Sequence, residues 1–299
     1  METIFITGAN GFLGQHLIQY FASKNFNVIA SGRGVCRIAA KEKFTYAELD
    51  LTNKNAVKEC LQTHQPSVII HTAAMSKPDE CNNNKEACLL HNIEATKNLT
   101  DAAESFSPHF IYISTDFVFG ENGPHDEENK PAPLNFYGET KLMAETLVKQ
   151  TGLLNCIVRI VFIYGVAWEG MRPSFLHWVK NNLEQNKKIK VVSDQLRTPT
   201  YVIDICNGIE KIIEQKANGI FHLAGKDILS PYQMAITVAD VLRLDKSLIE
   251  NVTSATFPEP VLRAKKSGLT IAKAASILGY SPVSFEEGVK LTFEQKNKN

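Results

Sequence analysis

Short apolar runs alternate with amphipathic segments through the first half of the chain. The runs have the length and continuous apolar character of strands buried on both faces, and they cover residues 3–7, 27–31, 67–72, 110–114 and 155–162. Helical spacing covers residues 14–23, 55–63, 85–106 and 136–151. Strands separated by helices indicate right-handed βαβ units. We therefore predict an α/β fold with a doubly wound parallel sheet of the Rossmann type.

The last third of the chain follows a different pattern. Helical spacing recurs at residues 174–185, 203–215, 231–242 and 269–278, and short strands are predicted at 189–192 and 220–223. We predict a dinucleotide-binding domain over residues 1–165 and a smaller α/β substrate lobe over residues 166–299. Short strands between about 187 and 225 are left open as additions to the main sheet.

Composition excludes several classes of function. The 299 residues contain 32 Lys plus Arg and 32 Asp plus Glu, so no net charge attracts the chain to nucleic acid or to an anionic membrane. The longest apolar run is shorter than the ~20 residues that span a bilayer, and the N-terminus lacks the basic region of a signal peptide. The six cysteines include no CxxC pair. We expect a cytoplasmic protein with reduced thiols and no metal site.

A glycine-rich motif follows the first predicted strand and opens the first helix. Its spacing is GxxGxxG, and its expected contacts with a cofactor are Gly8, Asn10, Gly11, Phe12, Leu13 and Gly14. Glycines allow a tight turn there, and they let backbone N–H groups approach a pyrophosphate at the positive end of the helix. The motif therefore predicts a nicotinamide dinucleotide site.

The end of the second strand indicates which dinucleotide binds. A site that prefers NAD usually has Asp or Glu there, whereas this chain has Arg33, whose planar guanidinium suits a 2′-phosphate. We therefore favour NADP(H), with NAD(H) as the alternative. Further contacts with the cofactor are expected at two other strand ends, from Asp50, Leu51, Thr72, Ala73 and Ala74.

Tyr137 and Lys141 are four residues apart on a predicted helix, so their side chains share one face. A nearby lysine cation favours the phenolate and lowers the pKa of the tyrosine, which can then exchange a proton with a carbonyl oxygen. Thr115 ends a buried strand at the edge where ligands bind, and its hydroxyl group can orient that carbonyl. Ser114 is the alternative, because strand alternation points one of the two hydroxyl groups away.

With these motifs, the chain resembles an extended short-chain dehydrogenase/reductase, and more narrowly the dTDP-4-dehydrorhamnose reductase family. The matching segments are residues 113–119 (ISTDFVF), 131–141 (PAPLNFYGETK), 194–195, 199–200 and 219–225 (GIFHLAG). The resemblance implies reduction by NADPH of the 4-keto group of a nucleotide-linked deoxysugar, as in dTDP-rhamnose biosynthesis. It also implies Thr115, Tyr137 and Lys141 as catalytic residues. The implied neighbours of the substrate are Asp116, Phe117 and Val118.

Three positions depart from the pattern of that family. Phe117 stands where tyrosine is usual, Phe162 where tryptophan is usual, and Arg197 where glycine is frequent. The two phenylalanines remove polar groups that could bind a sugar. An arginine at position 197 suits either a diphosphate or a structural ion pair. Related chains with this arginine include other sugar-nucleotide enzymes and a regulatory subunit of methionine adenosyltransferase.

Three functions agree with the sequence. The first is a reductase that acts on a nucleotide-linked sugar. The second is an NAD(P)-dependent epimerase of such sugars, and the third is a cofactor-sensing regulatory subunit without turnover. The intact set of Thr115, Tyr137 and Lys141 favours an enzyme, and a homodimer is left open.

Overall fold

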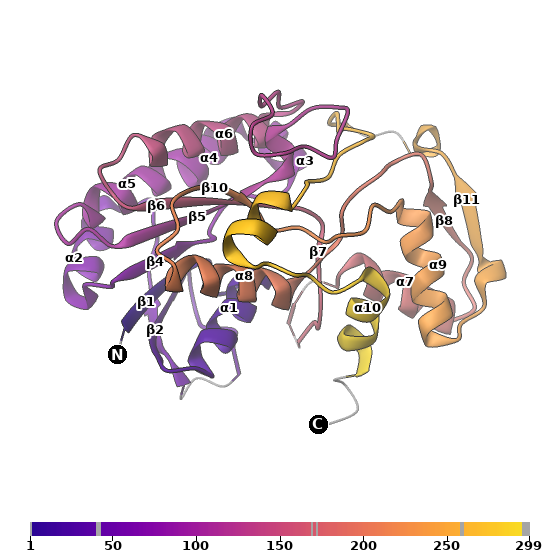
Figure 1. Ribbon diagram of the computed structural model, residues 1–299, viewed down its shortest axis with the longest axis horizontal. Helices are drawn as coiled ribbons and strands as arrows, with labels where there is room; N and C mark the ends of the chain where they lie inside the picture. The colour runs from indigo at the N-terminus through magenta and orange to yellow at the C-terminus, as the bar shows by residue number, and fades with distance from the viewer. Residues whose placement is uncertain (1, 40–42, 169, 172, 258–259, 295–299) are drawn as a thin grey trace.

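Seven parallel strands form the central sheet of the protein (Figure 1). The computed structural model describes residues 2–39, 43–168, 170–171, 173–257 and 260–294. The sheet has the order β10-β6-β5-β4-β1-β2-β3. Its strands are β1 (Glu2–Thr7), β2 (Phe26–Gly32), β3 (Thr45–Glu48), β4 (Val68–His71), β5 (His109–Thr115), β6 (Asn155–Ile160) and β10 (Gly219–His222). The predicted doubly wound parallel sheet is confirmed.

Helices cover both faces of this sheet (Figure 1). One face packs against α1 (Phe12–Ala22) and α8 (Val202–Glu214), and the other against α2 (Lys54–His64), α5 (Ala95–Ala103) and α6 (Phe136–Lys149). Ile4 and Ile6 of β1 belong to the first apolar cluster, whereas Phe5 belongs to the second. This alternation explains why the strands read as continuous apolar runs: both faces exclude water.

A smaller lobe lies beside the sheet, at the right of Figure 1. It contains α7 (Phe175–Glu184), α9 (Pro231–Leu242), α10 (Phe285–Glu294) and a parallel pair of strands, β8 (Ile189–Val192) and β11 (Ile249–Val252). A second short parallel pair consists of β7 (Ile163–Tyr164) and β9 (Thr200–Tyr201). In sequence, β7 lies between β6 of the sheet and α7 of the lobe, and β9 lies between β8 of the lobe and α8. Of the late strands, β10 joins the main sheet beside β6, and β8 does not.

Several predicted elements differ from the observed ones. Residues 85–106 are not one regular α-helix: α4 (Lys85–Leu89) continues through a π-helical turn (Leu90–Glu94) into α5. That turn contains the buried Asn92, whose side chain bonds to the backbone N–H and C=O of Met75. π-Turns often mark functional sites, and Met75 lines the cleft described below.

The predicted ends of two other elements were wrong. The strand predicted for 155–162 stops at Ile160, because Phe162 has φ 39° and turns the chain. The helix predicted for 269–278 is only a π-helical turn (Ala274–Leu278), because Leu269 pairs with His125 across the molecule. Periodicity does not detect such tertiary pairing. It also missed α10 and the short α3 (Pro78–Asn83).

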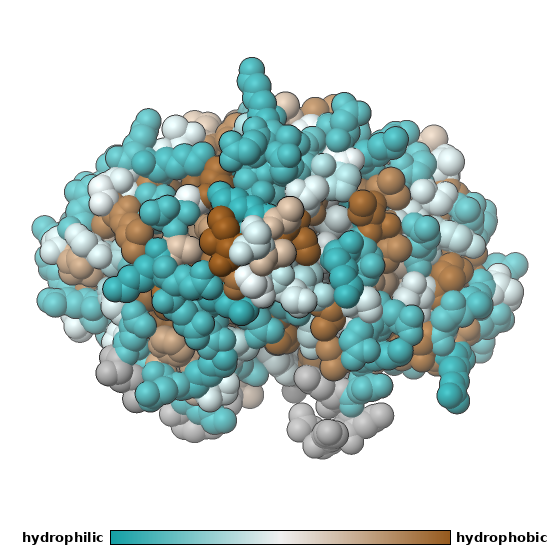
Figure 2. All heavy atoms as spheres, in the orientation of Figure 1, coloured by the Kyte–Doolittle hydropathy of each residue, from teal (hydrophilic) through white to brown (hydrophobic). Residues whose placement is uncertain are grey.

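Hydrophilic side chains cover most of the face seen in Figure 2, with apolar residues in small groups. Among the described residues, no helix is both long enough and apolar enough to cross a membrane. The described part of the chain also contains no group of three or more His, Cys, Asp or Glu side chains that could hold a metal ion. The six cysteines are free thiols.

Candidate active site

A cleft of about 930 Å³ opens at the carboxyl ends of the central strands. It brings together most of the residues predicted from the sequence. These are Gly8, Asn10, Gly11, Phe12, Leu13, Gly14, Arg33, Asp50, Leu51, Thr72, Ala73, Ala74, Thr115, Asp116, Phe117, Tyr137, Lys141 and Phe162. They come from the ends of six different strands and from the first turns of two helices, as expected where parallel strands end at one edge.

The glycine-rich turn joins β1 to α1 in a conformation that needs glycine. Gly8 has φ 72°, and a Cβ atom on Gly14 would lie 2.2 Å from the carbonyl oxygen of Gly8. The backbone at Gly8 is therefore too close to Gly14, in the first turn of α1, for any side chain at position 14. No side chain caps the N-terminus of α1, so backbone N–H groups face the cleft at the positive end of the helix. This arrangement suits an anion.

Asn10 links this turn to the loop after β2. Its side-chain carbonyl accepts from the backbone N–H of Arg37 at 2.9 Å, and its amide donates to the carbonyl oxygens of Arg33 and Val35 at 3.2 and 3.1 Å. Arg33 and Arg37 both line the cleft, and Nη1 of Arg33 lies 3.4 Å from Nε2 of His91. Two guanidinium groups thus lie where an NAD-preferring site usually has a carboxylate.

The end of β4 leaves room beside the turn. Thr72 donates through its hydroxyl group to the carbonyl oxygen of Thr7 at 2.6 Å, and Ala73 and Ala74 follow with small side chains. Behind them, His71 contacts the hydroxyl group of Thr7 at 2.8 Å, and burial lowers the pKa of His71 to about 3. This histidine is therefore neutral, and it holds the floor of the cleft without adding charge.

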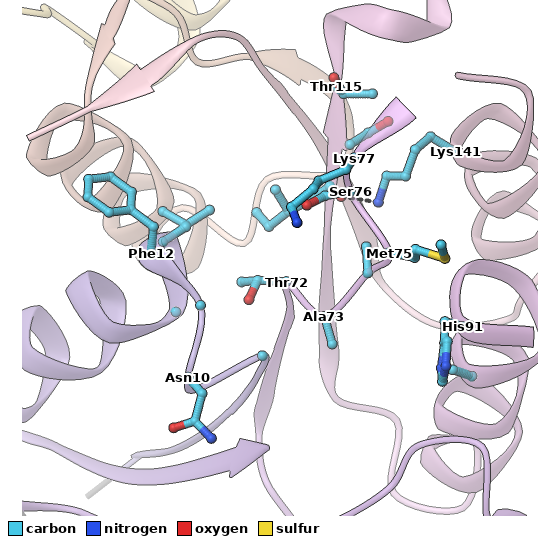
Figure 3. Close-up of a pocket in the computed structure, with 18 of the residues that line it drawn as sticks. Asn10, Phe12, Thr72, Ala73, Met75, Ser76, Lys77, His91, Thr115 and Lys141 are labelled. Atoms are coloured by element: carbon cyan, nitrogen blue, oxygen red, sulfur yellow. Dashed lines mark hydrogen bonds between the residues drawn. The ribbon is translucent and has the colours of Figure 1, made fainter. Parts of the chain in front are cut away.

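The predicted catalytic side chains meet at the far end of the cleft. Asn135 caps α6 by accepting from the backbone N–H of Gly138 at 3.0 Å, which places Tyr137 in the first helical turn. Thr115 lies near enough to the hydroxyl group of Tyr137 to lower the pKa of that phenol. Nζ of Lys141 donates to the carbonyl oxygen of Ile113 at 2.7 Å. Figure 3 shows Lys141 reaching from its helix toward the strand that carries Thr115.

The electrostatics of this group differ from the expectation drawn from the sequence. Burial raises the pKa of Tyr137, with a smaller opposing effect from Thr115, and burial lowers the pKa of Lys141 to about 7. Both side chains are less than a tenth exposed, so desolvation of the charged form has the largest effect on the pKa of each. In the chain by itself, Tyr137 is therefore a protonated phenol at neutral pH.

The choice between the two hydroxyl groups at the end of β5 follows from their partners. Ser114 donates to the buried carboxylate of Glu145 at 2.6 Å. Thr115 accepts from the backbone N–H of Phe117 at 3.3 Å and lies near enough to Tyr137 to lower the pKa of its phenol. Of the two hydroxyl groups, that of Thr115 is therefore the one beside Tyr137, which favours it for contact with a substrate carbonyl.

The residues expected near a substrate divide into two groups. Asp116 and Phe117 line the cleft, where Asp116 accepts from the hydroxyl group of Ser267 at 2.7 Å and Phe117 packs edge-on against Tyr137. Burial raises the pKa of Asp116. Val118, in contrast, is fully buried in an apolar cluster and does not reach the cleft. The guanidinium group of Arg197 also lies outside it and donates to the carbonyl oxygens of Leu196 and Lys265.

A second, more apolar pocket of about 400 Å³ lies in the small lobe, and Phe162 lines both spaces. The rings of Phe175 and Trp178 are stacked there, with centroids 5.8 Å apart and an angle of 29° between their planes. Lys190, Gln195 and Ser254 are the polar residues among those that line it. The pocket therefore offers a flat aromatic surface next to the cleft.

Comparison with known proteins assigns the family. The model of the RmlD substrate binding domain matches residues 1–297. The chain belongs to the RmlD family. This confirms the resemblance inferred from residues 113–119 and 131–141.

The proteins that this chain resembles carry different names. The beta subunit of methionine adenosyltransferase 2 from Pongo abelii is 33% identical over 270 residues, which cover 88% of this chain and 78% of that protein. A dTDP-4-dehydrorhamnose reductase structure from Clostridium acetobutylicum has a TM-score of 0.87 and 30% identity, covering 99% of each chain. The reductase of Bacillus anthracis, in complex with NADP, has a TM-score of 0.86 and 27% identity, covering 98% of this chain and 99% of that one.

Some residues of the cleft in this RmlD family member were not found from the sequence. Arg37 could have been noticed, since it follows Arg33 in the same loop. Met75, Lys77 and His91 carry no motif, because they reach the cleft through the α3 and π-helical segments, whose geometry is tertiary.

Proposed function

We propose that this RmlD family protein reduces the keto group of a nucleotide-linked deoxysugar, as dTDP-4-dehydrorhamnose reductase does, with NADPH as the cofactor. The observation that carries the proposal is that Thr115, Tyr137 and Lys141 meet in the same cleft as the glycine-rich turn. A cofactor site beside a proton donor is the arrangement that carbonyl reduction requires.

The residues of the cleft fit a phosphorylated dinucleotide. A Cβ atom on Gly14 would collide with the turn, so the glycine keeps the backbone close to a pyrophosphate. Arg33 and Arg37, oriented by Asn10, would bind a 2′-phosphate. Bound NADPH supplies hydride, and NADH is the weaker alternative because residues 31–33, at the end of β2, include no carboxylate that could accept from a free 2′-hydroxyl group.

Tyr137 would act as the general acid. Its raised pKa keeps the proton on the phenol until negative charge develops on a carbonyl oxygen, and Thr115 lies close enough for both hydroxyl groups to contact that oxygen. Lys141, one helical turn away, would stabilise the phenolate that remains. Solvent then restores the proton to Tyr137.

The second pocket supports a nucleotide-linked substrate. The stacked rings of Phe175 and Trp178 offer a surface for a planar base, and Lys190 also lines the pocket. Phe162 separates this pocket from the cleft, so a base in one and a sugar in the other would be joined across it. Phosphates that link the two would pass through this region. Arg197, on the segment after β8, lies close enough to Asp116 for its positive charge to oppose the rise in the pKa of Asp116 that burial causes.

A second candidate function has its own support. Several relatives at 30–33% identity are named as the beta subunit of methionine adenosyltransferase 2, so a cofactor-binding subunit without turnover is the main alternative. A nicotinamide-dependent epimerase of nucleotide sugars is the third. The complete Thr115, Tyr137 and Lys141 set favours turnover, because a sensor does not need a proton donor.

The test uses the purified protein with NADPH or NADH and a panel of nucleotide-linked 4-keto sugars, and follows the absorbance of reduced nicotinamide. Oxidation of NADPH by one of these sugars, lost in the Tyr137→Phe variant, is the expected result. Tight binding of NADPH without oxidation by any sugar would contradict the reductase and favour the subunit. Interconversion of sugar isomers without net oxidation would identify an epimerase.

A further inference from the structure

Glu145 continues the active-site face of α6. Tyr137, Lys141 and Glu145 recur every four residues, so their side chains lie along one side of the helix. Glu145 is fully buried, and it does not line the cleft. A buried carboxylate is costly unless it is paired, and the partners of this one show what it holds together.

The partners of Glu145 lie on the two neighbouring strands. Oε1 accepts from the hydroxyl group of Ser114 on β5 at 2.6 Å and from Nε of Arg159 on β6 at 2.9 Å. Oε2 accepts from Nη2 of Arg159 at 2.7 Å. Ser114 and Arg159 are themselves paired in the sheet, so one carboxylate joins α6 to adjacent positions of two strands.

Two consecutive residues of β5 are thus bonded to two positions of α6: Ile113 accepts from Lys141, and Ser114 donates to Glu145. The next residue of the strand, Thr115, lies near enough to Tyr137 to affect its pKa. A shift of the helix along the strand would break both bonds and move Tyr137 relative to Thr115. The alignment of the proton donor with the threonine is therefore coupled to the ion pair behind it.

Stability alone does not explain this pair. A buried ion pair is often no more stabilising than apolar residues of similar volume, and Ala144 and Val148 already pack α6 against the sheet. Apolar contacts fix the distance between the helix and the sheet but allow the helix to slide, whereas bidentate hydrogen bonds restrict both distance and direction. The ion pair therefore adds to the packing a defined position of α6 along the strands.

Glu145 also contributes negative charge beside Lys141. The other titratable groups that face this lysine are Cys81 from α3, Cys88 from α4 and His71 from β4, and the ring of Tyr112 from β5 lies 4.1 Å from Nζ. Among the groups that favour the charged lysine, Glu145 has the largest effect.

We propose that Glu145, held by Ser114 and Arg159, is a positioning residue of this active site. It aligns Tyr137 with Thr115 by setting the place of α6 on β5, and its carboxylate favours the charged form of Lys141. The inference rests on the proposed reductase function, and it assigns to the buried ion pair a role in turnover in addition to folding.

The main test replaces both charges together, as Glu145→Met with Arg159→Leu. Because no charge is left unpaired, the double variant should fold with a urea midpoint close to that of the wild type. Its kcat should fall about 10- to 100-fold, since a small misplacement of catalytic groups has that effect, while KM for NADPH changes less than about threefold. The alkaline limb of the kcat profile should move to lower pH, because Lys141 loses its proton more easily without Glu145.

Ser114→Ala provides a second variant that keeps the ion pair. It should lower kcat about 3- to 10-fold and leave KM for NADPH unchanged. Thr146→Ala, which removes an exposed hydroxyl group from the same helix, is the matched control and should leave kcat unchanged. A folded double variant with wild-type kcat and pH profile would overturn the proposal. If the double variant does not fold, an unchanged kcat in Ser114→Ala overturns it.

The outcome can be separated from that of the reductase proposal. A wild-type protein that oxidises no NADPH contradicts the reductase function and leaves kcat undefined. In that case, competitive labelling of lysine amines across pH, read by mass spectrometry, reports the pKa of Lys141 directly. A lower pKa in the double variant supports the role of Glu145, and an unchanged pKa overturns it.

Discussion

Replacement of Lys141 by methionine should stabilise the protein while removing its activity. Burial lowers the pKa of Lys141 from the ordinary value of 10.5 to about 7, so the folded state disfavours the charged amine. That difference corresponds to roughly 5 kcal/mol of free energy at low pH. Methionine has a similar length and no charge, so Lys141→Met removes this cost. It also loses the bond to Ile113, which contributes about 1 kcal/mol.

The sign of the effect depends on pH. Below pH 7 the lysine is protonated in both states, and the folded protein bears the whole cost. Between pH 7 and 10.5 the unfolded chain binds more protons than the folded one, so the free energy of unfolding of the wild type rises with pH through this window. The variant should therefore be more stable than the wild type by about 4 kcal/mol at pH 6, and by close to zero at about pH 9.5.

Urea unfolding at several pH values between these limits, followed by tryptophan fluorescence, measures this difference. Lys149→Met, which replaces an exposed lysine of the same helix, is the matched control and should show little change at any pH. A stability difference that does not depend on pH, or a variant less stable than the wild type at pH 6, would refute the reasoning. Loss of turnover should accompany the gain in stability.

Three further variants test the cleft and its neighbour. Tyr137→Phe should lower kcat by about 100-fold or more with unchanged binding of NADPH, and a wild-type rate would exclude Tyr137 as the acid. Arg33→Ala should weaken NADPH binding at least about 10-fold and NADH binding far less, measured by nicotinamide fluorescence; equal weakening would mean that Arg33 does not contact the 2′-phosphate. Trp178→Ala should raise KM for the nucleotide sugar about 10-fold with little effect on NADPH, and an unchanged KM would place the base elsewhere.

Local spacing was enough to predict the fold and much of the candidate site. The alternation of apolar runs and helices defines a doubly wound sheet, because βαβ units have one handedness. The GxxGxxG turn can be recognised from its place after a strand, and the four-residue spacing of Tyr137 and Lys141 places both side chains on one face of a helix. Each of these features depends on residues that are near one another in sequence.

Other features depended on contacts between distant segments. Leu269 pairs with His125 and thereby delays the start of a predicted helix, and Val118 turns into an apolar cluster instead of the cleft. His91 reaches the cleft only through a π-helical turn. No periodicity within one segment contains this information.

The sequence by itself determined the main strands, the glycine-rich turn and the candidate catalytic side chains, because those follow from spacing along one element. Only the tertiary structure decided how they act. It directed Ser114 to Glu145 and Thr115 to Tyr137, and it set the protonation of Tyr137 and Lys141. The partners of the hydroxyl groups and the protonation of Tyr137 and Lys141 both depend on burial. A charge or an unpaired polar group costs free energy where surrounding atoms exclude water, and those atoms come from segments that are distant in sequence.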